Sequence, residues 1–490
     1  MTTVLIEEIR KKKRQKKQKS AKILTKYKKE SKKTITFAAD MEKRSNFGSK
    51  LGIILASAGS AVGLGNVWRF PTEVGANGGA AFILIYIGCV VALGIPVMLS
   101  EFVIGRHTHS NTVDAYRALA PRTGWVAQGY LGVFTAWFIL CYYSVVAGWT
   151  MKYLVTAVCG QVTHISDSAA WFTQFTQSPW QPLLFTAIVL LLTHVIIVRG
   201  VQNGIERCSK VMMPMLLIII AVLGICSVCM PGAKEGLSFL LRPDFSKITR
   251  HTILSAMGQA FFSLSLAMGC LCTYASYFRD DTNLPKTAVS VVTIDTLVAI
   301  LSGFIIFPAV FSVGTAPDAG PGLVFITLPN VFQMVFEGLP LLGYLFSLMF
   351  YLLLILAALT STMSLHESVT AFLHERGLSR RSAARVVTGV CLTLGACCSL
   401  SFGVLKDVHL LPGMGFFDFF DYVSAKIFLP IGGIIISLFT GWKLDSRMVK
   451  GEITNNGTLK APLFKVYIFL LKWVAPIAIA LIFLNELGVF

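Results

Sequence analysis

Two apolar stretches of this sequence are interrupted by residues that form helices poorly. In the first, Gly59, Gly63 and Gly65 fall within the run G-S-A-V-G-L-G-N. In the second, residues 263–269 (S-L-S-L-A-M-G) place two hydroxyls and a glycine inside another apolar run. Each glycine costs a helix about 1 kcal/mol relative to alanine. Backbone carbonyl and N–H groups freed by a break can bind a cation and an anion, but at membrane depth they are tolerated only beside a cavity.

Two carboxylates lie inside other apolar stretches. A charge there costs several kcal/mol unless it is compensated, so a functional role is the default interpretation of Asp295. The alternative is a neutral, protonated Asp295 that shares a hydrogen bond. We interpret Glu101 as a buried, hydrogen-bonding structural acid rather than as a ligand.

The elements that must position these groups are membrane helices. The chain has 490 residues, of which 54% are hydrophobic and only 14% charged, too few for the surface of a soluble domain of this size. Several runs exceed the roughly 18 apolar residues that cross a bilayer. We predict an all-α, polytopic membrane protein with eleven spans, at about 49–73, 80–104, 124–158, 181–198, 208–230, 252–278, 288–314, 340–374, 383–404, 412–441 and 463–488.

The distribution of Lys and Arg between the loops predicts the orientation of the spans. Loops 160–180 and 315–339 contain neither residue, whereas loop 231–251 has four and is the exception. The loops that would face the cytoplasm are rich in basic residues. These are Arg106, Arg117, Arg122, Arg199, Arg207, Lys210, Arg376, Arg380, Arg381, Arg385, Lys443, Arg447 and Lys450. We therefore expect a cytoplasmic N-terminus and a C-terminus on the outer side.

The interrupted spans are the first and the sixth, so each begins a set of five. Interruptions at corresponding positions of two halves indicate a binding site between inverted repeats. Gly59 and Gly63 also fit the G-x-x-x-G spacing of closely packed helices, which is the alternative. The prediction is that residues 41–230 form helices 1–5, 231–441 form helices 6–10 as a second, inverted repeat, and 442–490 form helix 11.

The first 40 residues have a different composition, with 14 Lys or Arg against 4 acids. Because like charges repel and stay solvated, we expect a disordered cytoplasmic tail rather than a lipid anchor or a nucleic-acid-binding arm. Met41 is an alternative start of translation, so residues 1–40 need not be translated. No secretory signal is expected before the first span, and no nucleic-acid partner is expected.

The remaining reactive side chains do not indicate an enzyme. The pairs Cys226–Cys229 and Cys397–Cys398 lie in apolar runs without histidine partners, so we assign the cysteines to packing. His107 and His109 are expected in a loop. A membrane-embedded enzyme needs a nucleophile–base pair or a metal cluster inside its spans, and the sequence has neither. No catalytic residue is therefore assigned.

Seven segments together resemble the neurotransmitter:sodium symporter family, in family order, from about residue 41 to the C-terminus. They are R-S-N-F-G-S-K-L-G-I-I-L-A-S-A-G-S-A-V-G-L-G-N-V-W-R-F-P (44–71), N-G-G-A-A-F (77–82), G-I-P-V-M-L-S-E (94–101), C-Y-Y-S-V-V-A-G-W (141–149), G-Q-A-F-F-S-L-S-L (258–266), L-T-S-T (359–362) and F-D-F-F-D-Y (417–422). The resemblance implies two inverted five-helix repeats with helices 1 and 6 broken. The part of the family that this sequence resembles is the bacterial branch with eleven spans, which includes a leucine transporter.

The resemblance implies two sodium ions. The ligands implied for the first are the Ala61 carbonyl and the side chains of Asn66, Ser263 and Asp295, together with the substrate carboxylate. Those implied for the second are the carbonyls of Gly59, Val62 and Ala357 and the hydroxyls of Thr360 and Ser361. Without the resemblance, these two hydroxyls could equally bond back to their own helix.

The same resemblance bears on chloride. Animal members have an asparagine where this chain has Asp295, and they use chloride as a nearby negative charge. We hypothesise that Asp295 supplies that charge itself, so chloride is not expected to be required. An alignment shifted by one residue would place Ile294 there instead.

The implied substrate site suits a zwitterion. A half-helix N-terminus favours a carboxylate, which Gly65 N–H and the Tyr143 hydroxyl would hold. The ammonium would meet the carbonyls of Ala61, Phe262 and Ser263, with Ser265. Gly63 stands where monoamine carriers of the family have an aspartate, so the substrate should bring its own carboxylate. We therefore expect an amino acid rather than an amine.

The side-chain pocket implied by the resemblance carries no fixed charge, which favours hydrophobic or aromatic substrates. It comprises Ile139, Val146, Phe262, Met268, Thr362 and Leu365. Met268 stands where the leucine transporter has a phenylalanine, so the largest substrate side chain that the pocket accepts is left open. Ala267 replaces a glycine, so the width of the unwound segment is also left open.

The implied gates close on opposite sides of the membrane. Outside, Arg69 would pair with Asp421, with Tyr143 and Phe262 beneath them, and Glu73 could compete for Arg69. Inside, Arg44 would pair with Glu375 near Tyr277.

The expected function is sodium-coupled import of a neutral L-amino acid by alternating access, with the substrate, sodium ions and membrane lipid as partners, in a bacterial cytoplasmic (inner) membrane. The alternatives are a proton-coupled transporter of the related fold and a binding or sensor homologue that has lost coupling. The oligomeric state is left open.

Overall fold

The computed structural model describes residues 46–314 and 322–488, and these ranges are built from helices. No strand occurs in them, and a single isolated bridge joins Leu411 to Met414. The segment predicted to be a disordered basic tail, residues 1–40, lies outside the described residues. The predicted all-α class is confirmed.

Nine helical ranges in the described part of the chain are long and apolar enough to cross a membrane. The first four are Ala80–Thr108 (α4, Ala80–Cys89; η2, Val90–Gly94; α5, Ile95–Thr108), Val126–Val158 (α7), Gln181–Val198 (α9) and Val201–Val228 (η4, Val201–Glu206; α10, Arg207–Val228). The other five are Leu284–Ser312 (α14), Pro340–Glu375 (α16), Arg380–Leu400 (α17), Phe416–Lys443 (α18, Phe416–Asp421; η7, Tyr422–Phe428; α19, Leu429–Leu438; η8, Phe439–Lys443) and Phe464–Glu486 (α21, Phe464–Phe469; η9, Leu470–Val474; α22, Ala475–Glu486).

The two spans that the sequence predicts to be interrupted are broken. In the first, α2 (Lys50–Ala61) is followed by the π turn η1 (Gly65–Arg69) and by α3 (Phe70–Ala76), and the axes before and after the break differ by 54°. The other is divided into α12 (Arg250–Ser263) and α13 (Cys270–Ala275), each too short to cross a bilayer. The count of eleven spans and the inverted repeats stay predictions.

Short helices connect the spans. They are α6 (Thr112–Leu119), η3 (Val162–His164), α8 (Ser168–Gln177), α11 (Ala233–Leu241), η5 (Phe245–Lys247), η6 (Leu323–Thr327), α15 (Leu328–Val335) and α20 (Ser446–Ile453). Several begin with a side-chain cap, such as Asn111 on the N–H of Val113 and Asp445 on that of Arg447. Such caps satisfy donors that the first turn of a helix leaves unpaired.

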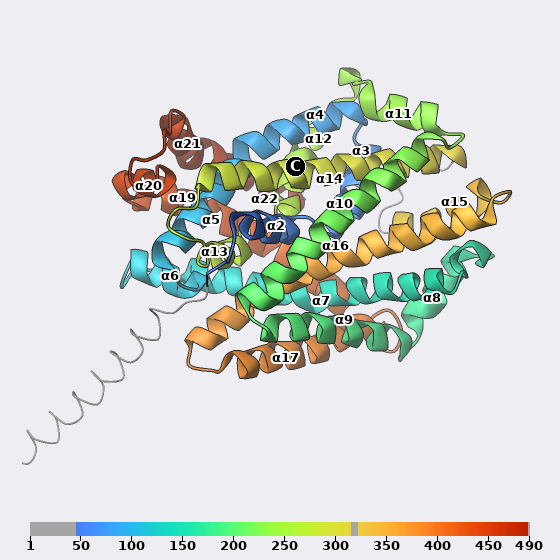
Figure 1. Cartoon of the computed structure of the whole chain (residues 1–490), viewed down its shortest axis with the longest axis horizontal. Helices are drawn as coiled ribbons and strands as arrows, with labels where there is room; N and C mark the ends of the chain where they lie inside the picture. Colours follow the sequence, from blue (N-terminus) through green and yellow to red (C-terminus); the bar gives the residue numbers. More distant parts are fainter. Residues whose placement is uncertain (1–45, 315–321, 489–490) are drawn as a thin grey trace, which may run out of the picture. The chain divides into compact units, whose positions relative to one another are not determined.

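The broken helix α2 is enclosed by other helices. It packs against α10, α14 and α16, while α12 packs against α4 and α22. On the other side of α16, helices α7, α9 and α17 run side by side (Figure 1). The interruption in α2 therefore lies among protein side chains rather than against lipid.

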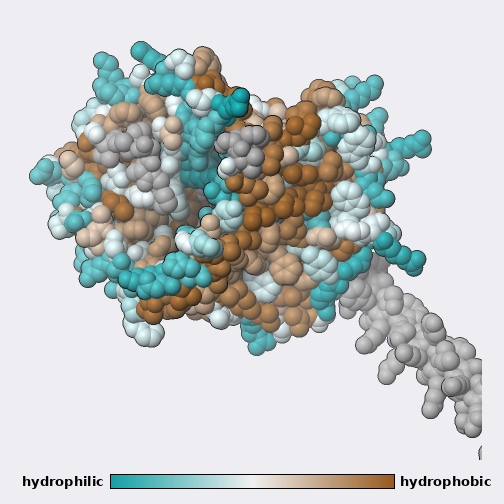
Figure 2. Space-filling view, turned by 180° about the vertical axis from the view of Figure 1, so that it is seen from behind, coloured by the Kyte–Doolittle hydropathy of each residue, from teal (hydrophilic) through white to brown (hydrophobic). Residues whose placement is uncertain are grey.

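Apolar side chains cover much of the outside. Ile218, Ile225, Leu341 and Ile477 are between 58% and 71% exposed, and Figure 2 shows apolar side chains spread across one face with hydrophilic ones toward its margins. In contrast, Asn66 and Asp295 are fully buried. This arrangement, with an apolar outside and polar groups within, is that of a protein with lipid as its solvent.

Close helix contacts depend on glycine at some positions. At Gly105, in α5, an added Cβ would lie 2.1 Å from the Cys272 carbonyl oxygen and 2.9 Å from the Ala275 Cβ, both in α13. At Gly88, in α4, an added Cβ would meet nothing within 4 Å. The α5–α13 contact is thus closed to any larger residue unless a backbone moves.

We expect Gly105→Ala to lower the melting temperature of the purified protein in detergent, because overpacking of this kind costs about 1–3 kcal/mol. Gly88→Ala is the matched control and should leave the melting temperature unchanged or slightly raised, since alanine favours a helix over glycine. Equal melting temperatures for the two variants would contradict the close contact.

Candidate functional site

The break in the first span exposes backbone groups that other helices satisfy. Val62 has an extended backbone (φ −67°, ψ 115°) immediately after α2. The Gly63 N–H donates to Asn66 Oδ1 (2.9 Å), and the Leu64 N–H donates to the Tyr143 hydroxyl (3.1 Å). The broken helix, rather than uninterrupted G-x-x-x-G packing, is the observed conformation.

The break between α12 and α13 contains left-handed backbone. Ser265 (φ 52°), Ala267 (φ 66°) and Gly269 (φ 70°) alternate with other conformations. For a residue with a Cβ this region costs roughly 1–2 kcal/mol, so Ser265 and Ala267 must be held by their surroundings. The Ser265 hydroxyl donates to the Ser60 carbonyl at 2.9 Å and so joins the two broken spans.

Three of the residues predicted to bind the first sodium lie in contact. Asn66 Nδ2 donates to Asp295 Oδ1 (2.7 Å) and to Ser263 Oγ (3.2 Å), and Ser263 Oγ donates to Asp295 Oδ2 (3.0 Å). All three side chains are at least 98% buried. The fourth predicted ligand, Ala61, ends α2 and lines the adjoining cavity.

Tyr86 was not predicted in this cluster. Its hydroxyl donates to Asp295 Oδ2 at 3.5 Å, and the ring is fully buried. A tyrosine in an apolar run gives no sequence signal of its own, so only the fold reveals this contact. Asp295 therefore has Asn66, Ser263 and Tyr86 as donors, which compensate a buried carboxylate.

The residues predicted for the second sodium lie where α2 faces α16. The Val62 carbonyl accepts from Ser361 Oγ (3.3 Å) and from Thr360 Oγ1 (3.5 Å). Thr360 Oγ1 also donates to the carbonyl of Ala357 at 3.0 Å, so this hydroxyl bonds back to its own helix as well as across to α2. At Gly59 an added Cβ would lie 3.2 Å from Thr360 Cβ, which shows how closely the helices approach.

A cavity lies between the two breaks. Its lining contains ten of the twelve residues predicted to bind substrate: Ala61, Gly63, Gly65, Ile139, Tyr143, Phe262, Ser263, Ser265, Met268 and Leu365. None of the lining residues, all of which the structure describes, is ionised at neutral pH. The space suits an uncharged side chain.

Two predicted pocket residues do not line the cavity. Thr362 is fully buried and is hydrogen-bonded to Thr193 Oγ1 of α9 (2.9 Å), because it lies about 100° around α16 from Ser361. Val146 is buried in α7, beyond Tyr143. Instead, Ser60, Ser361 and Ser364 complete the lining. Ser364 could have been identified from its i+3 spacing to Ser361.

The predicted outer ion pair is not formed. Arg69 Nε lies 3.7 Å from Glu73 Oε1, one turn along the same span, and Arg69 has no ion pair with Asp421. The guanidinium also lies 4.5 Å from the centre of the Phe262 ring, and Phe262 lines the cavity beneath it. Glu73 is therefore the competitor that the sequence indicated.

Part of the predicted inner gate can be described. Arg44 lies outside the described residues. Glu375 accepts hydrogen bonds from the N–H (3.0 Å) and Nδ2 (2.6 Å) of Asn111. The Tyr277 hydroxyl donates to Glu367 Oε1 at 2.7 Å.

Glu367 and Arg380 form a buried ion pair that the sequence analysis missed. Arg380 Nη1 and Nη2 donate to the two Glu367 oxygens at 2.9 and 2.5 Å, and Glu367 is fully buried. The signal in the sequence is a glutamate within an apolar run, because a carboxylate buried there needs a cation as its partner. Arg380 had been counted only as a loop charge.

Glu101 is buried as predicted, but its expected hydrogen bonds are absent. Neither carboxylate oxygen has a hydrogen-bond partner among the described residues. The side chain lies near the backbone of Ala267 and Gly269, in the unwound segment between α12 and α13.

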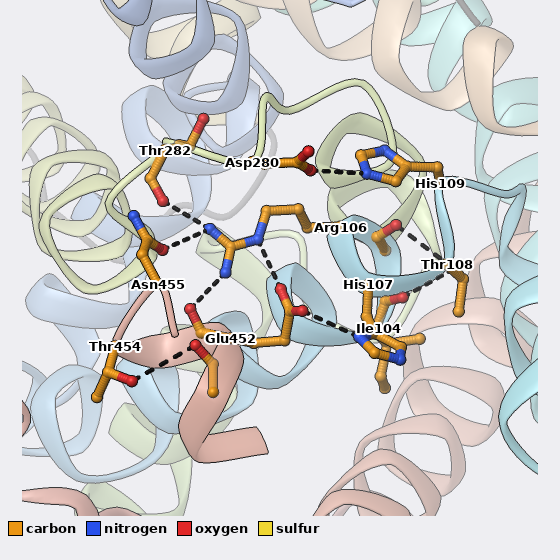
Figure 3. A network of polar contacts seen from close by, with 12 residues as sticks. Ile104, Arg106, His107, Thr108, His109, Asp280, Thr282, Glu452, Thr454 and Asn455 are labelled. Carbon is orange, nitrogen blue, oxygen red and sulfur yellow. Dashed lines mark hydrogen bonds and ion pairs between the residues drawn. The ribbon is translucent and has the colours of Figure 1, made fainter. Parts of the chain in front are cut away.

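A second network, shown in Figure 3, joins three segments at the end of α5. Arg106 is only 3% exposed and donates to Glu452 Oε2 (2.7 Å), the Thr282 carbonyl (2.6 Å) and Asn455 Oδ1 (2.9 Å). His107 Nδ1 lies 2.9 Å from Glu452 Oε1. The sequence placed Arg106 and His107 in a loop, whereas both belong to α5.

Comparison with known proteins gives a consistent result. The model described as "Sodium:neurotransmitter symporter family" matches residues 44–182 and 174–490. An uncharacterized sodium-dependent transporter of Bacillus subtilis, YhdH, is 39% identical over 452 residues, covering 91% of this chain and 99% of its own. The sodium- and chloride-dependent GABA transporter 2 of Mus musculus is 25% identical, covering 81% and 73%. The crystal structure of MhsT in complex with L-phenylalanine is 42% identical with a TM-score of 0.82, covering 91% of this chain and all of that one.

The Arg106 network predicts a pH-dependent stability. Burial raises the pKa of Glu452, but the hydrogen bond of His107 and the charge of Arg106 outweigh it and hold the pKa below its ordinary value. A lowered pKa stabilises the fold above the pKa of an unfolded glutamate, about 4.3, and this contribution is lost as the pH falls through the folded-state pKa. Glu452→Gln should therefore lower the melting temperature at pH 7, and the difference from wild type should shrink as the pH falls below about 4.3 and vanish below the folded-state pKa of Glu452. A difference that persists unchanged at low pH would contradict this assignment.

Proposed function

This chain belongs to the sodium:neurotransmitter symporter family, and we propose that it imports a neutral, hydrophobic or aromatic L-amino acid together with sodium ions by alternating access. It is a sodium-dependent transporter of that family, not an enzyme. The observation that carries the finer proposal is the uncharged cavity between two broken spans, adjoining the Asn66–Ser263–Asp295 cluster.

The substrate head group would lie at the breaks. Its carboxylate would meet Gly65 N–H, at the start of η1, and the Tyr143 hydroxyl, because a helix N-terminus favours an anion. Its ammonium would meet the Ala61, Phe262 and Ser263 carbonyls and Ser265. Gly63 supports an amino acid over an amine: it brings no carboxylate, and an added Cβ there would lie 2.6 Å from Ser361 Oγ.

The first sodium would take its ligands from Ala61, Asn66, Ser263 and Asp295, and from the substrate carboxylate. Hard cations prefer oxygen, and in this cluster Ser263 Oγ lies 3.0 Å from Asp295 Oδ2. The Asn66 amide oxygen accepts from the Gly63 N–H at 2.9 Å, while its Nδ2 donates to Ser263 and Asp295. Because the ion and the substrate would share an oxygen, each would raise the affinity for the other by the same factor.

The second sodium would lie where α2 faces α16, held by Gly59, Val62, Ala357, Thr360 and Ser361. The carbonyl of Val62 is already the meeting point of the Thr360 and Ser361 hydroxyls. An ion bound there would join the broken span to an unbroken one. Sodium binding would in this way favour the conformation in which the two helices are close.

The nature of the cavity wall supports a hydrophobic side chain. Ile139, Phe262, Met268 and Leu365 supply its large apolar side chains, and burying a charge among them without a partner would cost several kcal/mol. MhsT, 42% identical to this chain, was crystallised with L-phenylalanine. Met268 is unbranched and adapts to different shapes, so a range of apolar substrates is expected.

Alternating access would use both gates. We expect Arg69 to exchange between Glu73, which lies 3.7 Å from it in this structure, and Asp421, above Phe262 and Tyr143. On the inner side Arg44, Glu375 and Tyr277 would close the pathway. The proposed location is a bacterial cytoplasmic membrane, with the N-terminus inside and the C-terminus outside.

The deciding experiment is uptake of labelled L-phenylalanine into proteoliposomes with an inward sodium gradient, in competition with each of the twenty amino acids. Leucine, methionine and the aromatic amino acids should compete, whereas aspartate, glutamate, lysine and arginine should not. Uptake should stop when potassium replaces sodium. Uptake driven by a proton gradient without sodium would favour the proton-coupled alternative, and binding without uptake would favour a homologue that has lost coupling.

The charge of Asp295 predicts independence from chloride. Replacing chloride by gluconate on both sides of the membrane should leave wild-type uptake unchanged, because Asp295 supplies the negative charge beside the first sodium. Asp295→Asn should reduce uptake and make it respond to chloride. The mouse GABA transporter 2, named as chloride-dependent, is the positive control for the replacement of chloride by gluconate, which should reduce its uptake. Loss of wild-type uptake in gluconate would refute the role of Asp295.

A further inference from the structure

A lysine lies within the last membrane span. Lys472 belongs to the π turn η9, eight residues after the first residue of the apolar range Phe464–Glu486, which corresponds to about 12 Å along a helix. An ionisable residue at such a position is costly and marks a functional site by default. No carboxylate of the described residues lies within 4 Å of the Lys472 ammonium.

Two tryptophans stand beside this lysine. Lys472 Nζ lies 4.9 Å from the centre of the Trp442 ring, and Trp442 packs edge-to-face on Trp473 with the ring centres 5.0 Å apart. Trp442 and Trp473 are 53% and 50% exposed. Tryptophans concentrate at the level of the lipid head groups, so the ammonium is expected at the boundary between water and hydrocarbon.

The backbone holds this cluster in place. Trp442 belongs to the π turn η8, which contacts the π turn η9, and Trp442 Nε1 donates to the Lys472 carbonyl at 3.1 Å. An added Cβ at Gly441 would lie 3.1 Å from both Lys472 N and Lys472 Cγ. Single π turns occur frequently at functional sites. Here two of them face each other, and a glycine permits their contact.

Snorkelling alone does not account for the cluster. A lysine in a span extends its stem so that the ammonium reaches the interface, which explains the direction of the side chain. It leaves the charge without an anion, since a ring face contributes only a partial negative charge. The exposed Lys443 and Lys465 make this end of the two spans more positive, and Asp445 is engaged in capping α20. The anion present at this depth of a bilayer is the lipid phosphate.

We propose that the junction of η8 and η9 binds the phosphate of an anionic glycerophospholipid. Lys472 pairs with a phosphate oxygen, and Trp442 and Trp473 flank the glycerol. The acyl chains lie along the lipid-facing side of the last span, where Val466 and Phe469 are 51% and 56% exposed. A basic site between membrane helices is a known means of holding an acidic head group. This proposal is independent of the substrate and of the sodium sites.

The test is lipid-dependent thermal stability of the purified full-length chain. Dioleoyl-phosphatidylglycerol should raise the melting temperature of the wild type more than dioleoyl-phosphatidylcholine does. Lys472→Gln should bind phosphatidylglycerol about five-fold more weakly, as expected for the loss of one cation at the membrane surface. Lys465→Gln, on the same span but outside the Trp442–Trp473 cluster, is the matched control and should weaken the response less than Lys472→Gln does. An unchanged response in Lys472→Gln, or an equal loss in Lys465→Gln, would overturn the site.

A second measurement keeps the proposal testable if Lys472→Gln does not fold. Brominated phosphatidylglycerol should quench the tryptophan fluorescence of the wild type more strongly than brominated phosphatidylcholine, and Trp473→Phe should reduce that difference. Lys472→Arg should retain it, because a guanidinium also binds phosphate. Equal quenching by the two lipids would overturn the proposal. So would inorganic phosphate alone reproducing the stabilisation, since the site would then take a free anion.

Discussion

The structure depends on one constraint of the membrane interior, where every backbone N–H and C=O needs a partner within the protein. Two spans break this rule locally, and at the first break side chains of neighbouring helices restore it. Tyr143 accepts the Leu64 N–H, while Thr360 and Ser361 donate to the Val62 carbonyl. These are also the residues proposed to bind substrate and sodium. The groups that make the breaks tolerable are thus the groups from which a binding site can be made.

The second break adds strain to this arrangement. Ser265 and Ala267 adopt a left-handed backbone that favours glycine, and each costs roughly 1–2 kcal/mol. The bond from Ser265 to the Ser60 carbonyl is one of the contacts that offset this cost. A segment balanced in this way can change conformation when a ligand alters one of its contacts. This is consistent with the proposal that the site opens alternately to two sides of the membrane.

Different parts of this architecture could be predicted from the sequence to different degrees. Length, composition and the glycines of 59–65 indicate membrane helices and the first break, because they act locally. The meeting of Asn66 with Asp295, 229 residues away, came only from the family resemblance. Arg106 with Glu452 and Glu367 with Arg380 were missed, since a charge near the end of a span looks like a loop charge until its partner is placed. Arg69 shows the reverse: the distant partner Asp421 was expected, and the near one, Glu73, is bound.

The contact of Gly105 with the Cys272 carbonyl has a mechanical consequence. It locks α5 to α13, and the adjacent Arg106 fastens the same end of α5 to Thr282 and to α20. Displacing α13 would therefore drag α5 with it and pull on the connection between the last two spans. The final helix, which lies beyond both predicted repeats, would then be coupled to any movement of α13, and the viscous drag of the surrounding lipid on that helix would slow the movement.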